Sequence, residues 1–344
     1  MTRSIVVLFC LLGASPLAAQ ESNVPDPLFR DASVLEATIT GPFKTLIRER
    51  PKDDYLDGVL EYADPSGQNV TLDLEIRARG HFRHKHCDLP PVLLNLKRKQ
   101  TAGTLFEHQN KLKLVIQCER SDRSEQGLLK EYLAYRFLNA LTDKSFRVRL
   151  LSVTYVNTEN PRDNGPRYAF LIEHKNRLAE RFGLQDLKIE KTSVSALDGA
   201  QLNLTSVFEF MIGNTDFSPV AGLPDDECCH NYVLFGEDDM PRWAVPYDFD
   251  QSGLVDAPYA TPNPRFRLRD ATQRLYRGRC ANNEHLESSL QLFRDQENAI
   301  YSLIDEQVGL KPYVRKEVTG YIDDFYELIN DPRDVEKKIV DECL

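Results

Sequence analysis

The chain has 344 residues and a formal net charge of −10 at pH 7. This length supports a sizeable core, as one large domain or two lobes, and the negative charge argues against nucleic acid as the main partner. Beyond residue 20, no stretch approaches the roughly 20 apolar residues that a membrane-spanning helix needs.

Residues 1–20 have the pattern of a signal peptide. Arg3 supplies the positive start, Ile5 to Gly13 form an apolar run, and Ser15 to Gln20 form a small-residue cleavage region. We therefore expect an exported protein, periplasmic or extracellular, whose mature chain has no transmembrane segment.

Six cysteines remain once this segment is removed. An even number in an oxidising compartment favours disulfides, although the sequence leaves fifteen pairings open. Zinc is the alternative, but the chain has no CxxC pair, and the adjacent Cys228 and Cys229 are poorly spaced for tetrahedral ligation. The first pairing we expect is Cys87 with Cys118, because both flank one β-rich segment.

The first half of the chain is dominated by alternation of apolar and polar residues. This pattern predicts half-buried antiparallel strands between Val34 and Cys118, with a turn at Asp64 to Gly67. A broad apolar face with helical period then predicts a helix over 125–141. Further strands are expected at 146–156 and 168–173.

The second half is mostly helical in pattern. Helices are expected at 177–182 and 201–212, followed by a hairpin of 232–235 and 243–247. After Cys280 the pattern is helical to the end, with breaks near Gly309 to Pro312 and at Pro332. The sequence therefore predicts an α+β fold whose β-rich part gives way to a helix-rich part near Glu173.

Four oxygen-bearing side chains follow apolar elements between residues 213 and 253. Asp216 comes after Gly-Asn-Thr at the end of an apolar helix and is the candidate catalytic base. Asn231 and Asp248 are candidate metal ligands, with Asp250 as a second or bridging carboxylate, because Mg²⁺ prefers oxygen ligands. Each motif alone is typical of a structural turn. Their joint order, Asp, Asn, strand pair and Asp-Phe-Asp, is the order in kinase-type sites.

The run FEFMIGNTDFS…HNYVLF…WAVPYDFDQSGLV resembles the spore-coat protein H (CotH) family of secreted atypical protein kinases and its bacterial relatives. The resemblance is strongest over Val207 to Val255 and weaker but ordered upstream, at 76–80, 131–135 and 169–174. It implies a protein-kinase-like bilobal fold, with a β-rich N-lobe over 28–173 and a helix-rich C-lobe over 174–344.

The resemblance also implies a function. Asp216 would be the catalytic carboxylate, and Asn231 and Asp248 would hold Mg²⁺ or Mn²⁺. The phosphoryl donor would be ATP or another nucleotide, and the acceptor a hydroxyl on a protein or another cell-envelope component. The alternatives are a catalytically inactive kinase-like scaffold of the envelope and a metal-dependent phosphohydrolase.

The chain departs from the family pattern in two places. Residues 218–229 form a longer insertion than expected, and Leu89 to Val92 stand where the family tends to have lysines. The cation that pairs with phosphate would then be Arg79, Lys111 or Lys113, or be absent. Its carboxylate partner on a helix would be Glu131, or else Glu173.

The sequence excludes other enzyme classes and leaves one basic segment unassigned. It contains no GxSxG, GxxxxGK[ST] or GxGxxG motif, which argues against serine hydrolases, P-loop enzymes and Rossmann enzymes. Residues 259–276 carry four arginines, for which an acidic substrate and a solvated surface are both open interpretations: Arg265, Arg267, Arg269 and Arg274.

Overall fold

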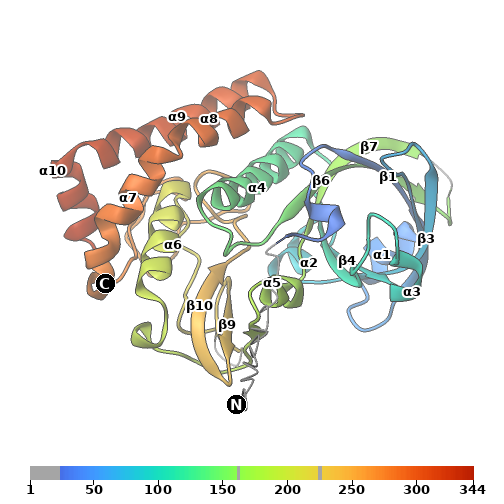
Figure 1. Ribbon diagram of the computed structural model, residues 1–344. Coiled ribbons are helices and arrows are strands. Elements are labelled where there is room, and N and C mark those ends of the chain that lie inside the picture. The colour runs from blue at the N-terminus through green and yellow to red at the C-terminus, as the bar shows by residue number, and fades with distance from the viewer. Residues whose placement is uncertain (1–23, 161–162, 224–226) are drawn as a thin grey trace, which may run out of the picture.

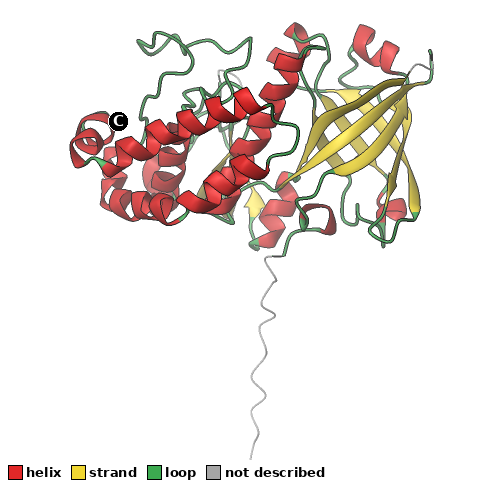
Figure 2. Cartoon of the chain, turned by 90° about the horizontal axis from the view of Figure 1, so that it is seen from above, coloured by secondary structure: helices red, strands yellow, loops and turns green. Residues whose placement is uncertain are grey.

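A computed structural model describes residues 24–160, 163–223 and 227–344. The predicted signal peptide lies outside these residues. A β-barrel occupies one side of the molecule and a group of helices the other, with the long helix α4 between them (Figure 1). The same division is seen from above in Figure 2, where the barrel strands lie on one side and the long helices on the other.

The barrel is closed and has seven strands in the order β1-β2-β3-β4-β5-β7-β6. Neighbouring strands are antiparallel except β1 and β6, which pair in parallel and close the barrel. The strands are β1 (Leu35–Gly41), β2 (Leu56–Ala63), β3 (Asn69–Ala78), β4 (Val92–Leu96), β5 (Lys111–Val115), β6 (Val148–Asn157) and β7 (Asp163–Ile172).

The alternation of apolar residues explains the barrel interior. Leu72, Leu74 and Ile76 are buried on β3, while the residues between them are more exposed. Leu112 and Leu114 of β5 join the same core. The predicted strands are therefore confirmed, but the alternation did not predict the parallel closure, because it reports which face is buried and not which distant strand is the neighbour.

Short helices lie around the barrel, and α4 connects it to the rest of the fold. Ser121 caps α4 by accepting a hydrogen bond from the Ser124 N–H, and the helix continues to Leu141, as predicted. Its buried face joins one core with the C-terminal helices. The helices of this half are α1 (Phe43–Glu49), α2 (Phe82–His86), α3 (Arg98–Thr101) and α4 (Asp122–Leu141).

The C-terminal half combines a small sheet with helices. The predicted hairpin is present as β9 and β10, and β8 pairs with β9. The predicted breaks are also confirmed, since helices end before and restart after each of them. The elements are α5 (Lys175–Arg181), β8 (Gln185–Asp186), α6 (Gly199–Ile212), β9 (Tyr232–Glu237), β10 (Met240–Pro246), α7 (Leu286–Asp295), α8 (Glu297–Glu306), α9 (Pro312–Asn330) and α10 (Pro332–Val335).

Disulfides pair the six cysteines, which confirms the preference over zinc. Cys87 is bonded to Cys118, as expected, and Cys280 to Cys343. The adjacent Cys228 and Cys229 are bonded to each other. No helix within the described residues is long and apolar enough to cross a membrane. The fold is thus α+β, with a closed barrel and a helical C-terminal region.

Candidate functional site

A cavity of about 700 Å³ lies between the rim of the barrel and the loops around β9 and β10. Its volume is in the range of small-molecule sites in proteins. It brings together six of the nine side chains that the sequence singled out. They are Arg79 and Lys113 from the barrel and Asp216, Asn231, Asp248 and Asp250 from the C-terminal half.

Asp216 is presented by the turn that ends α6. Gly213 terminates the helix in the left-handed region, at φ 65°, where a residue with a Cβ is strained. The Asn214 Oδ1 atom then accepts a hydrogen bond from the Asp216 N–H at 2.9 Å. The Asp216 side chain is 39% exposed, and its Oδ1 lies 2.9 Å from His230 Nε2. The turn therefore holds this carboxylate in a fixed place with access to the cavity.

Glu209 of α6 stabilises this turn through a hydrogen bond. It is buried on α6, and its Oε2 accepts a hydrogen bond from Asn214 Nδ2 at 2.9 Å. Burial raises the pKa of Glu209 to about 8, although the bond from Asn214 opposes the shift. No motif in the sequence marks Glu209, because a lone glutamate in an apolar helix shows no partner until the turn folds back on it.

Asn231 lies directly beside Asp216. Its Nδ2 donates to the Asp216 carbonyl oxygen at 2.6 Å and lies 3.2 Å from Asp216 Oδ2. Its backbone is left-handed, at φ 55°, a conformation that asparagine tolerates. No donor among the described residues contacts the side-chain oxygen of Asn231, so that atom is available to a metal ion.

Asp248 and Asp250 are held by the aromatic residue between them. Phe249 is fully buried, with its ring centroid 4.6 Å from that of Tyr135 on α4. The Tyr135 hydroxyl accepts a hydrogen bond from the Asp248 N–H at 2.9 Å. This anchoring directs both carboxylates into the cavity, and Asp250 accepts a hydrogen bond from the Tyr259 hydroxyl at 2.9 Å.

The charge of Asp248 disfavours the ionisation of Asp250. Burial, and next the charge of Asp248, raise the pKa of Asp250 to about 7, while Arg83 opposes the shift. A bound divalent cation would relieve this repulsion. Asn231, Asp248 and Asp250 line the same cavity and offer oxygen donors of the kind that Mg²⁺ and Mn²⁺ prefer. No group of three or more His, Cys, Asp or Glu ligands gathers anywhere in the described residues.

The barrel side of the cavity is cationic. Arg79 follows β3, and its Nε donates to the Val92 carbonyl oxygen at 3.3 Å. Lys113 of β5 has its ammonium 4.4 Å from the centroid of the Tyr247 ring. Burial, and next the charge of Arg79, lower the pKa of Lys113 to about 8. Cations thus face carboxylates across the cavity, as phosphate groups bound to a metal ion require.

Glu131 has a different partner from the one expected. It is buried on α4, and its Oε2 lies 3.6 Å from Arg83 Nη1. Burial raises the pKa of Glu131 to about 8, opposed by Arg83. The sequence led us to expect pairing with Arg79 or a lysine. Arg83 of α2 takes that role and contacts Glu131 at the middle of α4.

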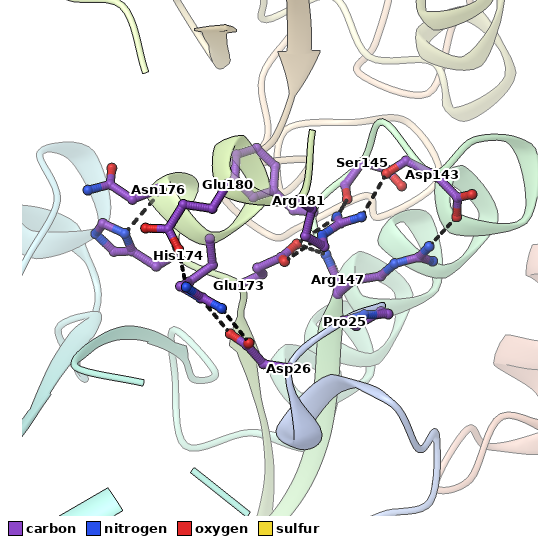
Figure 3. A network of polar contacts seen from close by, with 12 residues as sticks. Pro25, Asp26, Asp143, Ser145, Arg147, Glu173, His174, Asn176, Glu180 and Arg181 are labelled. Carbon is purple, nitrogen blue, oxygen red and sulfur yellow. Dashed lines mark hydrogen bonds and ion pairs between the residues drawn. The ribbon is translucent and has the colours of Figure 1, made fainter. Parts of the chain in front are cut away.

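Glu173 and Lys111 lie outside the cavity. Glu173 makes a buried ion pair with Arg181, with Oε1 and Nε 2.9 Å apart, as Figure 3 shows. Lys111 lines a separate cavity with His174 on the outer side of the barrel. Lys111 and Lys113 are two residues apart on the strand, and only Lys113 is reached by Tyr247. Neither Lys111 nor Glu173 is therefore brought to the candidate site.

The network in Figure 3 fixes the connection between the barrel and the small sheet. Arg181 also donates to the Ser145 carbonyl oxygen at 3.0 Å. Asp26, near the start of the described residues, forms an ion pair with Arg177 of α5, with Oδ1 and Nη2 2.7 Å apart. Because these groups are largely buried, the segment that follows β7 has a defined position relative to the cavity.

The sequence missed other groups that line this cavity or contact its lining residues. Tyr259 contacts Asp250 from a loop without regular structure, and no motif marked it. Lys175, Asp186 and Lys188 line the opposite end, where Asp186 lies 2.5 Å from Lys175. Only an observed contact could have found these residues, because isolated charged residues on loops carry no spacing signal.

In comparisons with known proteins, no family model, no curated protein and no solved structure matches the chain.

Proposed function

We propose that the protein is an exported, kinase-like phosphotransferase that moves a phosphoryl group from ATP, or another nucleotide, to a hydroxyl acceptor. The observation that carries the proposal is the cavity, in which Asp216, Asn231, Asp248 and Asp250 face cations from the barrel. The acceptor would be a protein or another component of the cell envelope. The three disulfides support an oxidising compartment outside the cytoplasm.

The arrangement supports a bilobal interpretation of the fold. The barrel, within residues 28–173, would be the N-lobe that covers the nucleotide, and residues 174–344 would be the C-lobe. The apolar lining by Leu93, Leu187 and Val233 suits a nucleobase, since flat apolar rings are bound between such side chains. Arg79 and Lys113 would neutralise the phosphates.

Asn231, Asp248 and Asp250 would hold Mg²⁺ or Mn²⁺, which would supply charge neutralisation at the phosphates. Asp216 would accept the proton of the acceptor hydroxyl as the new oxygen–phosphorus bond forms. The bond between the terminal phosphorus and the nucleoside diphosphate breaks in the same step. The contact with His230, at 2.9 Å, keeps the Asp216 carboxylate oriented for this role.

A catalytically inactive scaffold is the second candidate, and two observations favour it. Both oxygens of Asp216 are engaged, by His230 and by Asn231. In addition, Glu131 contacts Arg83 and not the lysine that would reach the phosphates. A scaffold would bind the nucleotide, or a partner, without transferring the phosphoryl group.

Nucleotide binding is tested by thermal unfolding of the oxidised protein with and without ATP plus Mg²⁺ or Mn²⁺. Nucleotide at 100 times its dissociation constant adds about 2.7 kcal/mol, which raises the melting temperature by several degrees. Asp248→Ala should abolish the rise, whereas Asp305→Ala, an exposed aspartate on α8, should keep it. No rise at millimolar nucleotide in folded wild-type protein would refute the proposal.

Transfer is tested separately, with ATP labelled in the terminal phosphate. Asp216→Asn should keep the nucleotide-dependent stabilisation but lose transfer of label to protein acceptors. Stabilisation without any transfer by the wild-type protein would favour the scaffold. Release of labelled phosphate to water, with no labelled acceptor, would instead favour a phosphohydrolase.

A further inference from the structure

The loop that follows the Asp-Phe-Asp motif carries exposed arginines that the proposed reaction does not use. Arg265, Arg267 and Arg269 are all exposed. Arg269 is next to Asp270 in the chain, and the two charges interact. Arg265 and Arg267 form no ion pair with any acidic group in the described parts of the chain. Two unpaired guanidinium groups thus lie on one short loop of a protein whose net charge is −10.

This arginine loop, residues 259–277, is hydrogen-bonded to the segment that contains Asp216. Asn263 Nδ2 donates to the Thr215 carbonyl oxygen at 3.0 Å. Arg277 Nη1 donates to the same oxygen at 2.9 Å and to the Phe217 carbonyl oxygen at 2.7 Å. The two carbonyls stand on either side of Asp216 in the chain, so the loop is held directly beside the candidate base.

The arginines themselves are close to this anchor. Asn263 closes a turn by accepting hydrogen bonds from the Arg265 N–H at 3.1 Å and the Phe266 N–H at 3.0 Å. The guanidinium of Arg277 contacts the rings of both Phe266 and Phe217, 4.7 and 4.6 Å from their centroids. The turn that presents Arg265 is therefore rigidly placed relative to Asp216.

The geometry points to an acidic acceptor. We propose that Arg265 and Arg267 bind carboxylates, or phosphates, of a protein segment whose hydroxyl lies at Asp216, an inference that rests on the proposed phosphotransferase function. Guanidinium groups bind both anions through paired hydrogen bonds. Because the loop is hydrogen-bonded to the residues on either side of Asp216, the acidic residues would stand within a few positions of the hydroxyl.

A protein segment fits this surface better than a lipid surface. The candidate cavity exposes two large apolar side chains, Phe82 at 45% and Leu223 at 46%. The arginine loop does not line this cavity but begins beside it, since the ring centroids of Phe82 and Tyr259 are 5.8 Å apart. Apolar contacts beside a small cationic cluster suit a peptide, which offers side chains of both kinds. An anionic membrane needs a broader basic face.

The test compares two serine peptides that differ only in having Glu or Gln at the four positions on each side of the serine. Wild-type protein should phosphorylate the Glu peptide with a kcat/KM about tenfold higher, mainly through KM, at low ionic strength. The variant R265Q/R267Q should lose that preference. The control R98Q/K99Q, which removes two exposed charges from the barrel at α3, should retain it.

The outcomes separate the two proposals. Equal rates on the two peptides, or a preference that persists in R265Q/R267Q at an unchanged melting temperature, would overturn the acidic acceptor and leave phosphotransfer standing. Absence of metal-dependent stabilisation by ATP in the wild-type protein would overturn both. Binding to phosphatidylglycerol vesicles that depends on Arg265 and Arg267, without any peptide preference, would assign the loop to a lipid surface and refute the peptide.

Discussion

Lys113 offers a direct test of the cation that would face the nucleotide phosphates. It is held in the cavity beside Arg79 and Tyr247, and its pKa is lowered to about 8 by burial and by the charge of Arg79. The perturbation is a change of pH from 7 to 9, over which the phosphates of Mg²⁺-bound ATP stay fully ionised. The ammonium form is the one that pairs with phosphate, so raising the pH should weaken nucleotide binding.

The magnitude follows from the fraction of protein in which Lys113 is protonated. With a pKa of about 8, that fraction is about 0.9 at pH 7 and about 0.1 at pH 9. If only the protonated form binds, the apparent dissociation constant of ATP should rise about tenfold, which corresponds to about 1.4 kcal/mol of binding free energy. An unperturbed lysine would give almost no change over the same interval.

The assay is isothermal titration of ATP with excess Mg²⁺ into wild-type protein and into Lys113→Arg at pH 7, 8 and 9. Arginine stays protonated throughout, so the variant should show a nearly constant dissociation constant. The number of protons taken up on binding to the wild-type protein should also rise toward one as the pH increases.

Two results would refute this reasoning. A constant affinity in the wild-type protein would mean that the charge of Lys113 does not contribute to binding. The same tenfold loss in both proteins would mean that another group, and not Lys113, titrates in the site.

Three further predictions concern stability. Replacing Cys87 and Cys118 by serine should cost about 3.7 kcal/mol in urea unfolding, from the loop-closure entropy of a disulfide that spans 31 residues; an unchanged midpoint would contradict this. Glu173→Ala should cost about 3–5 kcal/mol, because it leaves a buried arginine uncompensated, whereas Glu49→Ala, which breaks an exposed pair, should change little. The wild-type protein should lose stability as the pH rises, and Glu209→Gln should not show this loss. The folded pKa of about 8 exceeds the unfolded value of 4.5, so wild-type stability falls by up to about 1.4 kcal/mol per pH unit between these values, and equal pH profiles would refute the assignment.

Much of the element order could be read from the sequence. Alternation predicted the strands, and a helical period predicted α4 and α6, because these patterns record which face of an element is buried. The residues of the site could also be named, since Asp216, Asp248 and Asp250 directly follow apolar elements. Loops at the ends of buried elements are where binding side chains concentrate.

The partners within the site could not be predicted in the same way. The expected partner of Glu131 was a lysine or Arg79, yet it contacts Arg83, which reaches it from a five-residue helix that no pattern had marked. Lys111 and Lys113 are equivalent in the sequence, but only Lys113 faces the cavity. Such choices depend on the position of a neighbouring element, which is set by packing over the whole chain.

By itself, therefore, the sequence predicted the α+β class and most of the longer strands and helices, because these depend on local periodicity, and it suggested Cys87 with Cys118 as the first pairing among fifteen. Only the tertiary structure decided that β1 closes the barrel against β6, that carboxylates face cations across one cavity, and that the arginine loop lies beside Asp216. These features join segments far apart in the chain, and the free energy that selects them comes from burial and hydrogen bonds that exist only in the folded protein.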